Sequence, residues 1–320
     1  MGKGMNRHSL FISNFSKKTV FVTKALVMFV SIIIFGMIMA EQFEESYCAA
    51  VIDKVQRLCS MEEPKLVLLG DSNVVLGMDS KKLEEAMGMP VVNMALHAGI
   101  GNVFHERMAR LNVTKGDVYV YSPCSFADED RIEDPVLAWT AIGRHWELLE
   151  LIPKQDRWRM IKKYPTFLKK CMNRFIEGTG DSEIGEIYSR SNFNEYGDMA
   201  YKNPKYRWKF SEPVVPSEVN ERTAERINEL ADWLEERGAV LVVAAYPIAE
   251  GELTSPKEEF VEFQQELEQK LTCEVISDFT DYMYEYDYFY DSPLHLTVEG
   301  TDLRTKQLIE DLKNSGLSKP

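Results

Sequence analysis

Cysteine and histidine are both sparse in this 320-residue chain, which contains five of each. No Cys-x-x-Cys pair and no mixed cluster of the two residues has the spacing of a metal site. Cys48 and Cys59 are expected in one helix that follows residue 40, about 16 Å apart, which is too far for a disulfide. The sequence therefore predicts no metal centre and shows no evident disulfide framework.

Acidic residues are missing from residues 1–40, although the whole chain has a net charge of -14. The five basic residues of this segment are Lys3, Arg7, Lys17, Lys18 and Lys24. The remainder of the chain is therefore even more acidic than the total indicates, and it would repel a polyanion. This charge distribution argues against nucleic acid as a general partner.

The chain has a single long apolar run, which extends from Thr19 to Ala40 and is interrupted only by Lys24. About 20 apolar residues span a bilayer, so this run predicts a transmembrane signal anchor. Basic residues precede it and Glu41 follows it, which predicts a cytoplasmic N-terminus and an extracytoplasmic remainder. The alternative is a cleaved signal peptide, but Ile38 stands where a cleavage site before Glu41 needs a small residue.

Beyond a helical linker at 41–64, short apolar runs alternate with helical patterns. Strands are expected at 65–69, 90–95, 117–121, 239–246 and 273–277, and helices at 80–87, 102–111, 217–237, 256–271 and 298–313. Alternation at this spacing indicates βαβ units and a parallel sheet. We therefore expect an α/β domain made of residues 65–124 and 217–320. The intervening residues 125–216, rich in tryptophan, are expected to form a mainly helical cap over the carboxyl ends of the strands.

Two motifs near opposite ends of this domain suggest chemistry. Gly70-Asp71-Ser72 follows the first strand, at the edge of a parallel sheet where ligands bind. His295 lies in the loop before the last helix, four residues after Asp291. A serine, a histidine that takes its proton and a carboxylate that orients the imidazole form a nucleophilic triad.

With these motifs the chain resembles the SGNH/GDSL hydrolase superfamily. Gly70-Asp71-Ser72 is similar to its nucleophile block, 93–101 to the block that supplies an oxyanion-hole glycine, and Asp291–His295 to its acid–base block. The resemblance implies a doubly wound five-stranded parallel sheet of flavodoxin-type order, 2-1-3-4-5. It also implies catalysis by Ser72, His295 and Asp291 without a cofactor.

The resemblance has two departures. The family spaces its acid and histidine as Asp-x-x-His, whereas here Ser292 holds the acid position and the spacing is one residue longer. The family's oxyanion asparagine after the third strand is also missing. Gly99 is the first choice as oxyanion donor, with Gly101 second, and Ser125 is the nearest match to the missing asparagine. Asn73 and His97 are alternatives and are expected to contact substrate.

Departures of this kind, together with an anchor, resemble extracytoplasmic branches that modify cell-surface polysaccharides. The expected function is O-acyl transfer or ester hydrolysis at a surface glycan, with a membrane-bound acyl-donor protein as a possible partner. The alternative is an inactive SGNH-like domain that binds glycan or acts as a scaffold. A basic segment, Lys154–Arg174, with an apolar stripe at helical spacing is either a solvated helix face or a contact for an anionic polymer or lipid headgroups.

Overall fold

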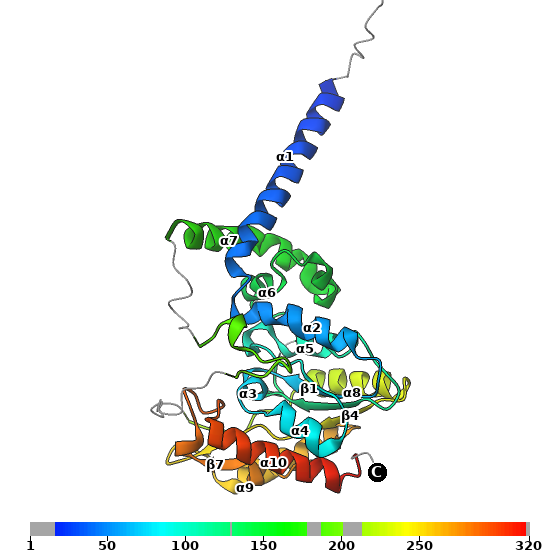
Figure 1. Cartoon of the computed structure of the whole chain (residues 1–320), viewed down its shortest axis with the longest axis vertical. Coiled ribbons are helices and arrows are strands. Elements are labelled where there is room, and N and C mark those ends of the chain that lie inside the picture. The colour runs from blue at the N-terminus through cyan, green and yellow to red at the C-terminus, as the bar shows by residue number, and fades with distance from the viewer. Residues whose placement is uncertain (1–16, 129, 178–186, 201–212, 318–320) are drawn as a thin grey trace, which may run out of the picture.

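A computed structural model describes residues 17–128, 130–177, 187–200 and 213–317. Helix α1 (Lys17–Ala40) projects away from the rest of the described chain (Figure 1). It is long and apolar enough to span a membrane, and almost none of its apolar surface is covered by the domain. An uncovered helix of this composition is unlike the core helix of a soluble protein, which is apolar because other elements pack around it.

The remaining described chain is built on a five-stranded parallel sheet with the order β2-β1-β3-β4-β6. These strands are β1 (Leu66–Gly70), β2 (Val91–Asn93), β3 (Val118–Ser122), β4 (Val240–Val243) and β6 (Glu274–Val275). Every residue of β1, β2 and β3 is buried. Continuous apolar runs suit strands that are covered on both faces, so the predicted α/β class and parallel sheet are confirmed.

Helices cover both faces of this sheet. In Figure 1, α2 and α5 lie on one side and α4 and α10 lie on the other. Helices α4 and α10 contact each other, and α9 contacts α8, which is joined to α5 by the ion pair between Arg226 and Glu106. Their bounds, with those of the remaining helices, are α2 (Val51–Ser60), α3 (Ser72–Val75), α4 (Ser80–Met87), α5 (Asn102–Met108), α6 (Pro135–Ile142), α7 (Arg157–Glu177), α8 (Glu221–Glu235), α9 (Lys257–Lys270) and α10 (Val298–Asn314). The helices expected near 80, 217, 256 and 298 therefore differ from the observed ones by a few residues at most.

A second, two-stranded parallel sheet was not predicted. It pairs β5 (Ile248–Glu250) with β7 (Met283–Glu285). Pro247 was expected to end the strand that starts at Ala239, and β4 does end before it, but the chain becomes extended again directly afterwards. The proline has no N–H to donate to a neighbouring strand, which explains an interruption but not a permanent end.

The linker after α1 is not the continuous helix that was expected. It forms two 3₁₀ turns, Glu41–Phe43 and Tyr47–Ala50, before α2 begins. Ser46 between them is extended and forms an antiparallel bridge with Ser189. Phe43 and Tyr47 are buried, so burial of these apolar side chains explains why the linker folds onto the domain. Cys48 consequently lies in a 3₁₀ turn and not in the helix that holds Cys59.

The long segment between β3 and α8 contains α6 and α7. Helix α7 packs against both α6 and the end of α1, and in Figure 1 it lies across the base of α1. Trp139 of α6 stacks on Phe167 of α7 with ring centroids 6.0 Å apart, and its indole N–H donates to the carbonyl of Met160. Aromatic side chains of α6 and α7 therefore pack against each other within this segment, beside the C-terminal end of α1.

Candidate active site

The candidate nucleophile lies in a tight turn between β1 and α3. Gly70 ends the strand with φ 151°, and Ser72 is the first residue of α3. A Cβ at Gly70 would lie 2.7 Å from the carbonyl oxygen of Ser122 on the neighbouring strand. Only glycine fits both this backbone angle and this close approach, so Gly70 allows the turn to lie directly against β3.

A buried polar cluster holds this turn in place. Oδ1 of Asp71 accepts hydrogen bonds from the backbone N–H and the side-chain amide of Asn73, both at 2.9 Å. Its Oδ2 accepts from the N–H of Cys124 at 2.7 Å, and the Asn73 amide also donates to the carbonyl of Ser122. Both side chains are buried below the turn. Asn73 is therefore committed to the turn and does not line the pocket at Ser72.

Arg304 of α10 supports the same region from below and is fully buried. Its guanidinium donates to the carbonyl of Asn73 at 2.8 Å, to the hydroxyl of Ser122 at 2.9 Å and to the carbonyl of Ala245 at 3.1 Å. Burial lowers the pKa of Arg304 to about 10, which leaves it charged at neutral pH. One cation thus ties the carboxyl ends of three adjacent segments to α10.

The structure brings the three predicted triad residues together. Nε2 of His295 lies 2.9 Å from Oγ of Ser72, and its Nδ1 lies 2.7 Å from Oδ1 of Asp291. Both distances are those of hydrogen bonds. Ser72 is more than 200 positions away from His295 in the sequence, and the two side chains meet at the carboxyl edge of the sheet.

The longer spacing between the acid and the histidine has a structural explanation. Phe289 and Leu296 form an antiparallel bridge, and the N–H of Tyr290 donates to the carbonyl of His295. The loop thereby folds back on itself and places Asp291 beside His295. Ser292, which stands where an acid was expected, instead accepts from the N–H of His295 at 3.2 Å and stabilises this loop.

Tyr188 is a contact that the sequence did not reveal. Its hydroxyl donates to Oδ2 of Asp291 and lies 3.2 Å from Nδ1 of His295. Burial alone would raise the pKa of Asp291, but the hydrogen bonds from His295 and Tyr188 outweigh it and leave this pKa below its ordinary value. The carboxylate is therefore ionised at neutral pH and oriented by two donors.

Neither protein-family models nor curated proteins match this chain.

A pocket of about 310 Å³ opens at Ser72 and His295. Its walls come from the linker after α1, from α6 and from α7. The lining residues are Phe43, Ser46, Tyr47, Cys48, Ser72, His97, Leu137, Thr140, Lys170, Tyr188 and His295. Most of this surface is apolar, and Lys170 is the one lining lysine. The pocket therefore suits a ligand with an apolar part that can reach the serine.

His97 lines this pocket, and its hydrogen bond identifies its tautomer. The N–H of Gly99 donates to Nδ1 of His97 at 2.9 Å. Because a backbone N–H can only donate, Nδ1 must accept and the proton of the neutral ring must lie on Nε2. Partial removal from water and the nearby His295 lower the pKa of His97, which favours this neutral form. The amide of Gly99 is thus already occupied, while His97 provides a donor at the pocket wall.

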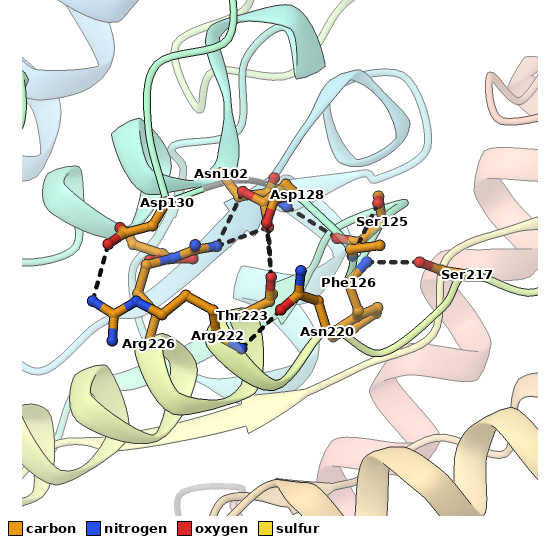
Figure 2. A network of polar contacts seen from close by, with 12 residues as sticks. Asn102, Ser125, Phe126, Asp128, Asp130, Ser217, Asn220, Arg222, Thr223 and Arg226 are labelled. Atoms are coloured by element: carbon orange, nitrogen blue, oxygen red, sulfur yellow. Dashed lines mark hydrogen bonds and ion pairs between the residues drawn. The ribbon is translucent and has the colours of Figure 1, made fainter. Parts of the chain in front are cut away.

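Ser125 and Gly101 do not contribute to this pocket in the described structure. The carbonyl of Ser125 accepts from Asn102 at 3.0 Å, and the next residue, Phe126, donates its N–H to Ser217. Figure 2 shows these contacts as part of a polar network that joins the segment after β3 to α8. Gly101 has a positive φ of 97° and precedes α5. Both residues shape the backbone beside the site.

The same network contains a buried cation with two carboxylates. Nε of Arg226 contacts Glu106 at 2.7 Å, and Nη2 of Arg226 contacts Asp128 at 2.8 Å. This ion pair links α8, α5 and the segment after β3, as Figure 2 shows for Arg226 and Asp128. It is a structural support that the sequence pattern did not indicate.

Among the described residues, no group of three or more histidine, cysteine and acidic side chains is arranged to hold a metal ion.

Proposed function

We propose that this chain is a membrane-anchored acyl-ester enzyme in which Ser72 is the nucleophile. The observation that carries the proposal is the Ser72–His295–Asp291 chain of hydrogen bonds, at 2.9 and 2.7 Å. The turn at Gly70, the cluster around Asp71 and the brace from Arg304 all hold the serine in this position. Such support for one partly buried serine at a pocket is what nucleophilic catalysis needs.

The resemblance to the SGNH/GDSL superfamily supports the same proposal. Its nucleophile, glycine-bearing and acid–base blocks correspond to segments after β1, after β2 and before α10. The sheet order β2-β1-β3-β4-β6 agrees with the order that this resemblance implies. The segment with α6 and α7 acts as the cap in this proposal, because both helices line the pocket.

The proposed reaction begins with attack of Ser72 Oγ on an ester carbonyl. Nε2 of His295 takes the hydroxyl proton as the C–O bond forms, and the ionised Asp291 stabilises the resulting imidazolium. The carbonyl oxygen becomes an oxyanion. When the tetrahedral intermediate collapses, the bond to the leaving alcohol breaks and His295 returns the proton to that alcohol. The product of this half-reaction is an acyl ester on Ser72.

Two donors are proposed for the oxyanion. The first donor is the backbone N–H of Ser72. Ser72 is the first residue of α3, and the first N–H groups of a helix have no intrahelical acceptor. The second donor is Nε2–H of His97, whose tautomer is set by Gly99. This assignment replaces Gly99 as the first choice, because the Gly99 amide is occupied by His97. A histidine donor compensates for the missing asparagine after β3.

In the second half-reaction an acceptor hydroxyl attacks the acyl-enzyme. His295 removes its proton, the acyl group moves to the acceptor oxygen, and the proton passes to Ser72. Water as acceptor gives hydrolysis, and a sugar hydroxyl gives O-acyl transfer. The proposed acceptor is a cell-surface polysaccharide, and a membrane-bound protein is a candidate acyl donor. With α1 as a single-pass anchor and a cytoplasmic N-terminus, the domain would lie outside the cell beside both.

Active-site labelling with a fluorophosphonate tests this proposal directly. The full chain in detergent should be labelled at Ser72, as identified by peptide mass spectrometry, and it should hydrolyse small acetyl esters slowly. Ser72→Ala should abolish both signals. Ser125→Ala is the matched control, because that serine lies outside the pocket, and it should retain both. Labelling and hydrolysis that survive in Ser72→Ala would remove the nucleophile assignment.

A second candidate function is a silent glycan-binding or scaffolding domain. The observation that favours it is the hydrogen bond from the Gly99 N–H to His97. This bond leaves the N–H of Ser72 as the one proposed backbone donor to an oxyanion. Absence of labelling at Ser72 in a chain that still binds a surface glycan would support this candidate over the enzyme.

A further inference from the structure

Helix α7 has a second apolar face besides the one that packs on the domain. Its buried stripe consists of Met160, Phe167 and Cys171. Four other large apolar side chains are between 58% and 72% exposed: Trp158, Ile161, Phe175 and Ile176. At 100° per residue, these four lie on one side of the helix with the partly buried Leu168 and Met172 between them. An apolar stripe of this length, left uncovered, indicates a contact surface.

Helix α1 leaves the domain from this same side of α7. Gly36, in the last turns of α1, is buried against α7. A Cβ at this position would collide with the hydroxyl of Tyr164 and would lie 3.4 Å from Cδ2 of Leu168. Leu168 belongs to the second apolar stripe, so the stripe is continuous with the surface of α1. Figure 1 shows α7 crossing the base of α1, with the rest of the domain beyond it.

Basic side chains border this stripe. Lys162 and Lys169 lie next to the Trp158 and Ile176 edge by helical rotation, and Nζ of Lys162 lies 5.5 Å from the centre of the Trp158 ring. Helix α7 contains seven lysine and arginine residues and a single acidic residue, Glu177, in a chain whose net charge is -14. Local positive charge on an acidic protein points to an anionic partner.

We propose that the exposed face of α7 lies in the headgroup region of the same bilayer that α1 spans, with Lys162 and Lys169 at anionic lipid headgroups. An amphipathic helix with aromatic and aliphatic side chains on one face and lysines along its edge binds in this way. Its long lysine side chains keep their charges at the headgroups. The inference rests on the proposed anchoring role of α1.

This placement also locates the active site. Lys170, from another side of α7, and Phe43, three residues beyond the end of α1, both line the pocket. Nζ of Lys170 lies 5.2 Å from the centre of the Phe43 ring. The pocket is thus lined by α7 and by the turn that directly follows α1. With α7 at the headgroups, Ser72 would face esters presented at the membrane surface.

Depth-dependent fluorescence quenching tests the contact of Trp158 with lipid. The full chain is placed in nanodiscs of phosphatidylcholine and phosphatidylglycerol, with or without brominated acyl chains. Brominated lipid should quench the wild type, and Trp158→Phe should lose this component of quenching. Trp233→Phe is the control: Trp233 lies on α8 between Arg110 and Arg237 and should leave the quenching unchanged.

Charge reversal tests the preference for anionic lipid. In the wild type, quenching of Trp158 should be stronger with phosphatidylglycerol than with phosphatidylcholine alone. Lys162→Glu combined with Lys169→Glu should remove that difference. Lys306→Glu combined with Lys313→Glu, which has the same spacing on the exposed side of α10, should keep it.

Different outcomes report on the lipid contact of α7, on membrane anchoring by α1 and on the proposed acyl chemistry at Ser72. A chain that floats with liposomes but shows no quenching of Trp158 overturns the inference alone. Protection of Trp158 by a second copy, detected as a dimer by light scattering, overturns it as well. A chain that does not float at all overturns the anchor and this inference together. Labelling of Ser72 is measured on the same samples and reports the enzyme proposal independently.

Discussion

Tyr188 donates a hydrogen bond to Asp291, the carboxylate that also accepts from His295. Tyr188 comes from the long segment after β3, whereas Asp291 lies just before α10. The segment that covers the pocket therefore contacts the candidate triad through a side chain of its own. Burial raises the pKa of Tyr188 well above its ordinary value. The hydroxyl therefore keeps its proton and remains a donor at any working pH.

Replacing Tyr188 tests the importance of this contact. Tyr188→Phe removes one of two side-chain donors to a partly buried carboxylate, an interaction worth about 2 kcal/mol. We expect kcat for a small acetyl ester to fall by about 10-fold, with KM unchanged. Tyr196→Phe is the control, because the hydroxyl of Tyr196 contacts Glu84 and not the triad. Equal rates for both variants would show that Tyr188 does not position the acid.

Replacing His97 decides between the two oxyanion assignments. If Nε2–H of His97 is the donor, His97→Ala should lower kcat by about 10²–10³. If Gly99 is the donor, the same change releases its amide and should preserve or raise kcat. Steady-state kinetics with one activated ester distinguish the two results. Unfolding curves of both proteins provide the control for folding.

Replacing Gly70 tests the turn that holds the nucleophile. Gly70→Ala places a methyl group against Ser122 at an unfavourable φ, and we expect it to lower the free energy of unfolding by about 2–3 kcal/mol. Labelling of Ser72 should fall in the variant that remains folded. Gly251→Ala is the control, since no atom lies within 4 Å of a Cβ at that position. Urea denaturation of both variants would contradict this explanation if the two midpoints were equal.

Because the ring of His105 is buried, we expect the protein to lose stability in mild acid. Both of its ring nitrogens are buried without a partner in the described structure, and burial lowers its pKa to about 4. The unfolded chain has an ordinary value near 6.5 and therefore binds more protons between these two pH values. Hence the free energy of unfolding rises with pH in this window, and about 3 kcal/mol is lost as the pH falls from about 6.5 to 4.

A pair of variants isolates this titration. His105→Phe should reduce the slope of stability against pH between those values, measured by urea denaturation at several pH values. His145→Phe is the control for the substitution itself, because His145 is partly exposed and its ring contacts Glu147 at the surface. An unchanged slope in His105→Phe would assign the acid sensitivity to other groups.

The sequence by itself determined the α/β class, the five strands of the parallel sheet and the apolar N-terminal helix. Each of these depends on local patterns: continuous apolar runs such as Leu66–Leu69 suit strands that are covered on both faces, and apolar residues at helical spacing mark the helices that begin near residues 80 and 298. Ser72 and His295 were recognised because short motifs at strand ends occupy the same edge of a parallel sheet.

Tertiary structure alone decided the surroundings of these residues. Tyr188 and the pocket wall at Phe43 and Tyr47 come from segments far from the motifs, and Arg304 reaches the Ser72 turn from α10. No local pattern distinguishes these residues from ordinary packing residues. The hydrogen bond from the Gly99 N–H to the ring of His97 depends on the rotamer of that ring and on the path of the loop between them. The expected helix at 41–64 was interrupted because burial of Phe43 and Tyr47 outweighs local helix propensity. Contacts between distant segments depend on how the whole chain packs, and a periodic pattern records only which side of an element is covered.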